Sequence, residues 1–191
     1  MLTIKVTCQG ISPLLMNLMS DETLEGLRTG VRTSKPTDLT SEQEAEKKLY
    51  KDSNNGNMIG IPALNLYSCM IEAGRSVKNG KKQISTKDSS NLPSFLQIDE
   101  EFLPFINEAK WVVDKRRGRL PKDGTAVCLV RPKFPEWEFK VTLRVDETIC
   151  AENTARKLLE TAGSTIGLCA FRPTCRGPFG RFKVTEWKIQ K

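Results

Sequence analysis

Apolar and polar residues alternate in three segments of the chain, which is the pattern of a β-strand with one buried face. These segments are residues 2–8, 139–145 and 182–189. In the last segment the apolar phase shifts between Val184 and Trp187, which indicates a β-bulge. The sequence therefore predicts one strand at each end of the chain and one more in its C-terminal half.

Helical spacing of apolar residues predicts two principal helices. The first opens at Ile61-Pro62, where proline suits the first helical turn, and continues until Gly80 stops it. The second covers about residues 151–162 and ends at Gly163, because glycine readily adopts the left-handed conformation found just beyond helix ends.

The section from residue 20 to residue 60 is the most polar part of the chain. Ser41 and Glu44 have the spacing of a capping box, which predicts a short helix near residues 42–50. The remainder is expected to form exposed loop. We therefore interpret residues 20–60 as a polar insertion.

Residues 92–131 predict further strands and a hairpin. Apolar residues broken by the acidic residues 99–101 predict one or two short strands between 92 and 106. Two apolar runs, at 111–113 and 126–130, bracket the basic run Lys115-Arg-Arg-Gly-Arg119. This arrangement predicts a hairpin at about 111–131 with a basic tip.

The order of these elements indicates the fold class. A strand, a helix, several strands and a closing strand–helix–strand unit predict a single α+β domain over residues 1–191, with helices on an antiparallel sheet. A ferredoxin-like (RRM-like) β-α-β-β-α-β core fits this order. The polar insertion and the basic hairpin would then be additions to that core.

Residues 163–183, called the arginine segment below, lie between the second helix and the last strand. They contain four glycines, two prolines and the cations Arg172, Arg176, Arg181 and Lys183, without an acidic residue. Glycine lets the backbone approach a ligand closely, proline stiffens the chain, and arginine presents donors suited to phosphate. We interpret the segment as a cradle for the backbone of a polyanion. The alternative is a connector whose arginines are merely solvated.

The distribution of charge favours an anionic partner. Thirty Lys and Arg residues against 23 Asp and Glu residues give a net charge of +7. Residues 110–144 contain ten basic and four acidic side chains, and residues 172–191 contain six and one, whereas residues 20–60 contain six and eight. Basic segments that are separate in sequence can converge on one surface. A basic protein without an anionic partner is the alternative.

The chain contains no histidine, and therefore lacks the commonest general base and metal ligand. The six cysteines form no Cys-x-x-Cys pair and are interpreted as reduced core thiols. No nucleotide-binding loop or serine nucleophile motif occurs. The sequence favours a non-enzymatic protein without a cofactor or a metal. A nuclease is the alternative, and Asp114 is the acid that metal-assisted cleavage would use.

No apolar run approaches the roughly 20 residues of a membrane span. The first residues also lack the apolar block of a signal peptide. We therefore expect a cytoplasmic protein with no membrane partner.

Three features occur together in this chain: an opening strand that runs into Gly10-Ile-Ser-Pro-Leu-Leu-Met16, a helix opened by Ile61-Pro62-Ala63, and a glycine-rich loop before the last strand. In these features the chain resembles the RAMP superfamily, the ferredoxin-like RNA-binding proteins of CRISPR effector complexes, and above all their backbone subunits. A related short protein of phages and mobile elements is the alternative.

The resemblance implies a protein that grips the phosphate backbone of single-stranded, guide-type RNA. It also implies a homo-oligomer along that strand, as part of an antiviral ribonucleoprotein complex. The acidic 20–60 region would then contact a basic surface of the next protomer. The candidate nucleic-acid-binding residues are Arg172, Arg176, Gly177, Gly180, Arg181 and Lys183 in the arginine segment, Lys115, Arg116, Arg117 and Arg119 in the hairpin, and Arg75, Lys78, Lys81 and Lys82 near the end of the first helix.

Two other functions remain open at this point. A single-stranded DNA-binding protein of phage replication or recombination would use the same cations together with stacking aromatics such as Phe171, Phe179 and Trp111. Phosphate contacts alone do not separate RNA from DNA. A protein-binding module that imitates a CRISPR subunit would instead lack a strong, salt-dependent affinity for nucleic acid.

Overall fold

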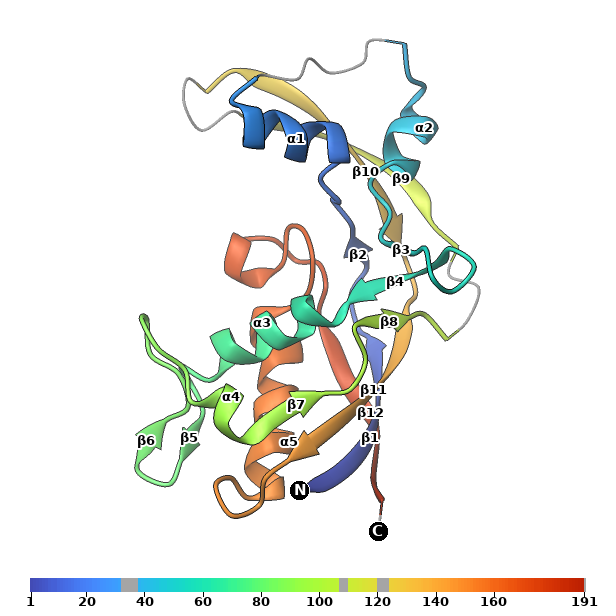
Figure 1. Cartoon of the computed structure of the whole chain (residues 1–191). Coiled ribbons are helices and arrows are strands. Elements are labelled where there is room, and N and C mark those ends of the chain that lie inside the picture. Colours follow the sequence, from blue (N-terminus) through green and yellow to red (C-terminus); the bar gives the residue numbers. More distant parts are fainter. Residues whose placement is uncertain (32–37, 107–109, 120–123, 191) are drawn as a thin grey trace.

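The computed structural model describes residues 1–31, 38–106, 110–119 and 124–190. Within these ranges the main sheet has four antiparallel strands in the order β12-β1-β11-β7 (Figure 1). The strands are β1 (Leu2–Gly10), β7 (Leu96–Ile98), β11 (Glu138–Val145) and β12 (Phe182–Gln190). The first strand of the chain is therefore central, between two strands from its C-terminal half.

Two helices, α3 (Ala63–Ala73) and α5 (Glu152–Thr161), pack on one face of this sheet (Figure 1). Helix α5 continues into a π-helical turn, Ala162–Ile166. No helix in the described ranges is long and apolar enough to cross a membrane. The core side chains of β1 and β11 alternate along each strand, and they are Ile4, Val6, Cys8, Phe139, Val141, Leu143 and Val145. Helices on one face of an antiparallel sheet make the fold α+β, as the sequence predicts.

The bulge predicted in the last strand is present in β12. Thr7 pairs with Glu186 and Cys8 pairs with Val184, so Thr185 is the extra residue on β12. Because of this insertion, Val184 and Trp187 both pack against the core although their spacing is odd.

A second sheet continues from the main one toward the top of Figure 1, with the strand order β2-β10-β9. Its strands are β2 (Leu14–Leu15), β9 (Val112–Arg119) and β10 (Ala126–Phe134). The predicted hairpin is confirmed, but the prediction that its cations form the tip is wrong. Strand pairing continues through the whole basic run, with Lys115 opposite Val130 and Arg119 opposite Ala126. Residues 120–123 lie outside the described ranges.

The polar section contains a helix, α1 (Asp21–Thr29), where the sequence predicts exposed loop. The side chain of Ser20 caps its N-terminus by accepting a hydrogen bond from the backbone N–H of Thr23. Gly30, with a φ of 74°, forms its C-terminal cap. Both signals are present in the sequence, but helix α1 exposes Leu24 and Leu27 and therefore lacks a buried apolar stripe.

A second short helix, α2 (Ser41–Glu46), corresponds to the helix predicted near 42–50. Its capping box is formed by Thr40 and Gln43, one residue earlier than predicted. The helix packs against the hairpin, and Nζ of Lys48 donates a hydrogen bond to the carbonyl oxygen of Val130 at 2.5 Å. The polar section is therefore attached to the second sheet.

Residues between α2 and β9 add short elements around the two principal helices. Strands β3 (Lys51–Asp52), β4 (Met58–Pro62) and β8 (Phe102–Pro104) form a small sheet. A one-turn helix, α4 (Leu92–Phe95), precedes β7. Strands β7 and β8 are the short strands that the sequence predicts between 92 and 106.

Both principal helices end at positions other than the predicted ones. Helix α3 ends at Ala73, and Gly80 lies in the turn between β5 (Lys78–Asn79) and β6 (Lys82–Gln83) with a φ of 62°. A glycine in the left-handed region supports a hairpin turn as well as a helix stop. Gly163 lies inside the π-helical turn, and Gly167, with a φ of 78°, ends it.

None of the six cysteines, all of which lie in the described ranges, is in a disulfide, and only some belong to the core as predicted. Cys8, Cys69 and Cys150 are buried, and Cys169 is partly buried. Cys128 on β10 and Cys175 are exposed, so the interpretation of these two as core thiols is wrong. Cys128 faces away from its apolar neighbours Val127 and Leu129, because successive strand residues face opposite sides, and Cys175 stands between the polar Thr174 and Arg176.

Candidate nucleic-acid interface

The arginine segment is anchored by backbone hydrogen bonds to β2 and to the residue before it. The N–H of Gly180 donates to the carbonyl oxygen of Pro13 at 2.8 Å, and the N–H of Ala170 donates to that of Leu15 at 2.9 Å. Within the segment, the N–H of Leu168 donates to the carbonyl oxygen of Gly180 at 2.9 Å. The segment is therefore a fixed surface rather than a slack connector.

Packing explains two glycines that the sequence assigned to ligand binding. A Cβ atom on Gly177 would lie 1.8 Å from the carbonyl oxygen of Phe171. A Cβ on Gly180 would lie 2.0 Å from the carbonyl oxygen of Leu168, and Gly180 also has a φ of 74°. The fold therefore requires both glycines. A contact of either glycine with phosphate stays a prediction.

Three other residues of the segment have a left-handed backbone without being glycine. Cys169, Phe171 and Arg176 have φ values of 59°, 56° and 60°. Such conformations cost on the order of 1–3 kcal/mol each and cluster at functional sites. All three lie within the arginine segment.

The cations of the arginine segment have different environments. Arg172 is half-buried, and its guanidinium donates a hydrogen bond to the carbonyl oxygen of Cys169 at 3.0 Å. Arg176, Arg181 and Lys183 are exposed. Arg172 therefore holds the segment together, while the other three are accessible to a ligand.

The hairpin and the arginine segment meet through two cation–π contacts. The guanidinium of Arg116 on β9 lies 4.5 Å from the ring centroid of Phe179. That of Arg131 on β10 lies 5.6 Å from the ring centroid of Phe171, and its Nε donates to Oδ1 of Asn17 at 3.3 Å. Burial lowers the pKa of Arg131 from its ordinary value, and the nearby Asp114 acts in the opposite direction. Two basic segments of the sequence thus converge on one surface.

Asp114 has a structural partner in this junction. Its carboxylate is buried and accepts hydrogen bonds from Nε and Nη2 of Arg116 at 2.5 and 2.9 Å. The carboxylate raises the pKa of Arg116. This ion pair orients Arg116 toward Phe179, which gives Asp114 a structural role.

The other cations of the hairpin point away from this junction. Successive residues of a strand face opposite sides, so Lys115, Arg117 and Arg119 lie on the face opposite to Arg116. All three are exposed. The four hairpin cations therefore form two groups, of which only Arg116 adjoins the arginine segment.

The structure does not bring the basic residues after helix α3 to the same place. Arg75, Lys78, Lys81 and Lys82 are exposed around the β5–β6 hairpin. This hairpin bonds to the connection before α5, where Nδ2 of Asn79 donates to the carbonyl oxygen of Ile149 at 2.7 Å. In Figure 1 it lies at the end of the molecule opposite to the β9–β10 hairpin. It forms a separate basic patch.

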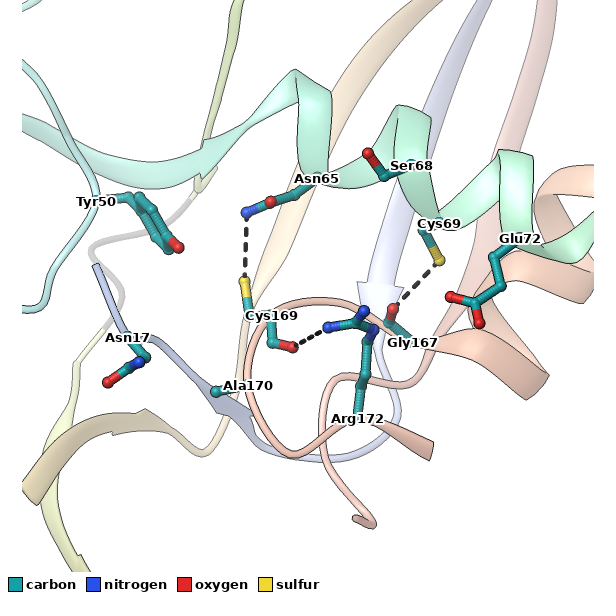
Figure 2. A pocket seen from close by; sticks show the side chains of 10 residues that line it. All are labelled: Asn17, Tyr50, Asn65, Ser68, Cys69, Glu72, Gly167, Cys169, Ala170 and Arg172. Carbon is teal, nitrogen blue, oxygen red and sulfur yellow. Dashed lines mark hydrogen bonds between the residues drawn. The ribbon is translucent and has the colours of Figure 1, made fainter. Parts of the chain in front are cut away.

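A polar pocket (Figure 2) lies beside the surface on which the hairpin and the arginine segment meet. It has a volume of about 260 Å³ and lies between helix α3 and the start of the arginine segment. Burial raises the pKa of the Cys69 and Cys169 thiols to about 12 each, so both are neutral at pH 7. The lining residues are Asn17, Tyr50, Asn65, Ser68, Cys69, Glu72, Gly167, Cys169, Ala170 and Arg172.

The free face of the main sheet has a different chemistry. Its exposed positions on β1 and β11 include Lys5, Gln9, Lys140 and Arg144. RRM domains stack bases on aromatic side chains of this face. The positions on β1 and β11 that face this side carry no aromatic residue. An exposed aromatic side chain therefore lies in the arginine segment, at Phe171, and not on this face of β1 and β11.

Sequence patterns missed Asn17, Tyr50, Asn65 and Arg131, which line the pocket or join the hairpin to the arginine segment. These are single polar residues in apolar or loop stretches, and no local spacing distinguishes them. Of the three aromatics named as stacking candidates, Phe179 is buried under Arg116 and Trp111 is packed against the core. Phe171 is the accessible one of the three.

Comparisons with known proteins find similarity in structure but not in sequence. No protein-family model matches the sequence, and no curated protein matches it. The chain is similar to a chain in the cryo-EM structure of the Type III-B Cmr-beta complex bound to cognate target RNA. The TM-score is 0.59 at 10% sequence identity, and the match covers 100% of this chain and 61% of that one. The likeness shows a shared fold, and this chain spans less than two thirds of its relative's length.

Proposed function

We propose that this chain is a RAMP-like, non-enzymatic RNA-binding protein that grips the backbone of a single strand with its arginine segment. The observation that carries the proposal is the junction between the β9–β10 hairpin and the arginine segment. There Arg131 and Arg116 meet Phe171 and Phe179, beside the exposed cations of the segment. Clustered cations with an accessible aromatic suit phosphates and an unpaired base.

The core of the fold supports this class. We infer a ferredoxin-like β-α-β-β-α-β core formed by β1, α3, β7, β11, α5 and β12. The strand order β12-β1-β11-β7 and the antiparallel pairing agree with that inference. The fold shared with a chain of an RNA-bound CRISPR complex agrees with it as well.

The proposed path of the strand follows from where the cations lie. It runs over Phe171 and Arg131, past the mouth of the polar pocket, and along the exposed Arg176 and Arg181. A nucleic-acid strand would reach Lys115, Arg117 and Arg119 on β9, or the cations of the β5–β6 hairpin, only if it continued beyond this surface. They remain proposed secondary contacts.

We further propose that copies of the chain assemble along the strand as backbone subunits of a cytoplasmic ribonucleoprotein complex. A head-to-tail contact between different surfaces forms filaments when it does not close into a ring. The charge difference between the acidic polar section and the basic remainder supports such a contact.

Single-stranded DNA is the second candidate ligand. Exposed Phe171 beside Arg131 is a stacking platform that accepts either nucleic acid. Discrimination requires contacts to the 2′-hydroxyl group. A module that imitates a CRISPR subunit by binding protein is the remaining alternative.

The first test is the nucleic acid that copurifies with the protein at moderate salt, resolved with RNase and DNase. RNA of regular lengths is expected. Copurifying DNA would instead favour a single-stranded DNA-binding protein of phage replication or recombination. Monomeric protein that neither copurifies with nor binds RNA or DNA would favour the protein-binding module.

The second test removes two exposed cations of the arginine segment, with Arg176→Ala and Arg181→Ala combined. Affinity should fall alike for all sequences, and the slope of log K against log salt should decrease by about 1.4, or ~0.7 per lost phosphate contact with a single strand. The control is Lys87→Ala with Lys157→Ala, which removes the same charge from other exposed positions. Equal slopes for the two double variants would remove the arginine segment from the binding site.

A further inference from the structure

The polar pocket contains groups that can recognise a flat, hydrogen-bonding ring. Asn65 projects from helix α3 into the space above the arginine segment, with Tyr50 and Asn17 at one end and Arg172 and Glu72 at the other (Figure 2). Nδ2 of Asn65 donates to Sγ of Cys169 at 3.9 Å. A thiol is a weak acceptor, so a stronger acceptor on a ligand can replace it.

Chemistry distinguishes this pocket from the surrounding surface. Side-chain amides bond to base edges through paired donors and acceptors, whereas the exposed arginines outside serve phosphates. Glu72 opposes an anion inside the pocket, and the guanidinium of Arg172 already donates to the Cys169 carbonyl. The neutral thiols of Cys69 and Cys169 add apolar surface without charge. The pocket therefore disfavours phosphate and suits an uncharged polar ring.

The size of the pocket further limits which ligands fit. Its volume of about 260 Å³ falls just below the lower end of ordinary ligand pockets, roughly 300 Å³. A single ring system fits such a volume better than a whole nucleotide. The sugar and phosphate would stay outside, beside Arg131 and Phe171.

We propose that this pocket receives one nucleobase of the bound single strand, with Asn65 bonding the base edge and Tyr50 flanking the ring. The proposal rests on the proposed function, because the base enters from a strand held by the arginine segment. It adds sequence preference to a protein that would otherwise read only the backbone.

The experiment measures affinity for homopolymeric RNAs of one length, oligo(U), oligo(A) and oligo(C), at several salt concentrations. A homopolymer presents the same base to the pocket in every register. The wild-type chain should prefer one base by about fivefold or more, the discrimination of one good base contact. Asn65→Ala should remove the preference and leave the salt slope unchanged. Asn153→Ala, an exposed asparagine on α5, is the matched control and should keep the preference.

A second readout does not depend on the folding of the variant. RNA with 5-iodouridine is irradiated in complex with the wild-type protein, and the cross-linked peptide is sequenced. A cross-link at Tyr50 supports the proposal. Cross-links confined to Phe171 overturn it, because the base then stacks outside the pocket.

The outcomes separate the two proposals. Equal affinity for all homopolymers, or a preference that survives Asn65→Ala, overturns the base pocket and leaves backbone binding intact. No affinity for any RNA or DNA overturns the proposed function and the base pocket with it.

Discussion

Gly180 and Gly30 have the same left-handed φ of 74° but different surroundings. A Cβ on Gly180 would meet the Leu168 carbonyl oxygen at 2.0 Å, whereas a Cβ on Gly30 would have nothing within 4 Å. Left-handed backbone alone costs a non-glycine residue about 1–2 kcal/mol. A substitution of Gly30 therefore tests backbone strain alone, whereas a substitution of Gly180 tests backbone strain together with a steric clash.

We expect Gly180→Ala to lower the free energy of unfolding by about 3 kcal/mol or more, since strain and a backbone clash add. Gly30→Ala should cost only about 1 kcal/mol from backbone strain. Chemical denaturation of both variants measures the difference. Equal costs would mean that the arginine segment shifts easily, in contrast to the anchored surface described above.

The sequence predicts the residue types of the candidate binding surface better than their structural environments. The arginines of residues 172–181 were identified from composition, but not that Arg172 turns inward to bond Cys169. That orientation depends on left-handed φ values at Cys169 and Phe171, which no local pattern encodes. Asn65 and Tyr50 are isolated polar residues, and they line one pocket only because helix α3 packs beside the arginine segment.

At the scale of elements, the contact between β9 and the arginine segment depends on the pair Arg116 and Phe179. A double-mutant cycle with Arg116→Ala and Phe179→Leu should give a coupling free energy of about 0.5–2 kcal/mol, because leucine keeps apolar volume but loses the aromatic face. Denaturant unfolding of the four proteins supplies the measurement. The control cycle uses Arg117→Ala, on the opposite face of β9, and should show coupling near zero. Similar coupling in both cycles would contradict the assigned faces.

Helices and strands are predictable from the sequence where a local pattern of apolar residues marks them. Their ends are less predictable. Alternation identified β1, β11 and β12, and even the bulge at Thr185, because each strand has one buried face. Helix α1 was missed, since its exposed Leu24 and Leu27 produce no inward stripe despite good caps. The apolar runs predict the hairpin but place the basic run at its tip, because only the register with β10 shows that the run is strand.

The arrangement of the whole molecule depends on contacts between residues that are far apart in the sequence. Strand β1 lies between β11 and β12, and residues 13–15 hold the arginine segment. These pairings join the two ends of the chain. Composition indicates that basic segments can converge, but only these long-range pairings determine which segments meet. The hairpin meets the arginine segment, and the β5–β6 patch stays apart.

Assembly along a strand requires a surface for the next copy, and helix α1 has the features of one. It exposes Leu24 and Leu27 next to the acidic Asp21 and Glu22, opposite in charge to most of the molecule. Apolar residues rimmed by charge mark protein contacts. We therefore expect α1 to contact a basic surface of the neighbouring protomer in the proposed filament.

The matched test compares two exposed leucines on helices. Leu27 on α1 is 68% exposed and Leu64 on α3 is 70% exposed. Glutamine retains helix propensity and removes the apolar contact. Leu27→Gln should prevent assembly on long RNA in light scattering and leave affinity for a short RNA unchanged, while Leu64→Gln should assemble normally. Normal assembly by Leu27→Gln would place the contact elsewhere. Loss of short-RNA affinity in the same variant would instead connect α1 to the nucleic-acid surface, because a pure protomer contact does not act on a single bound copy.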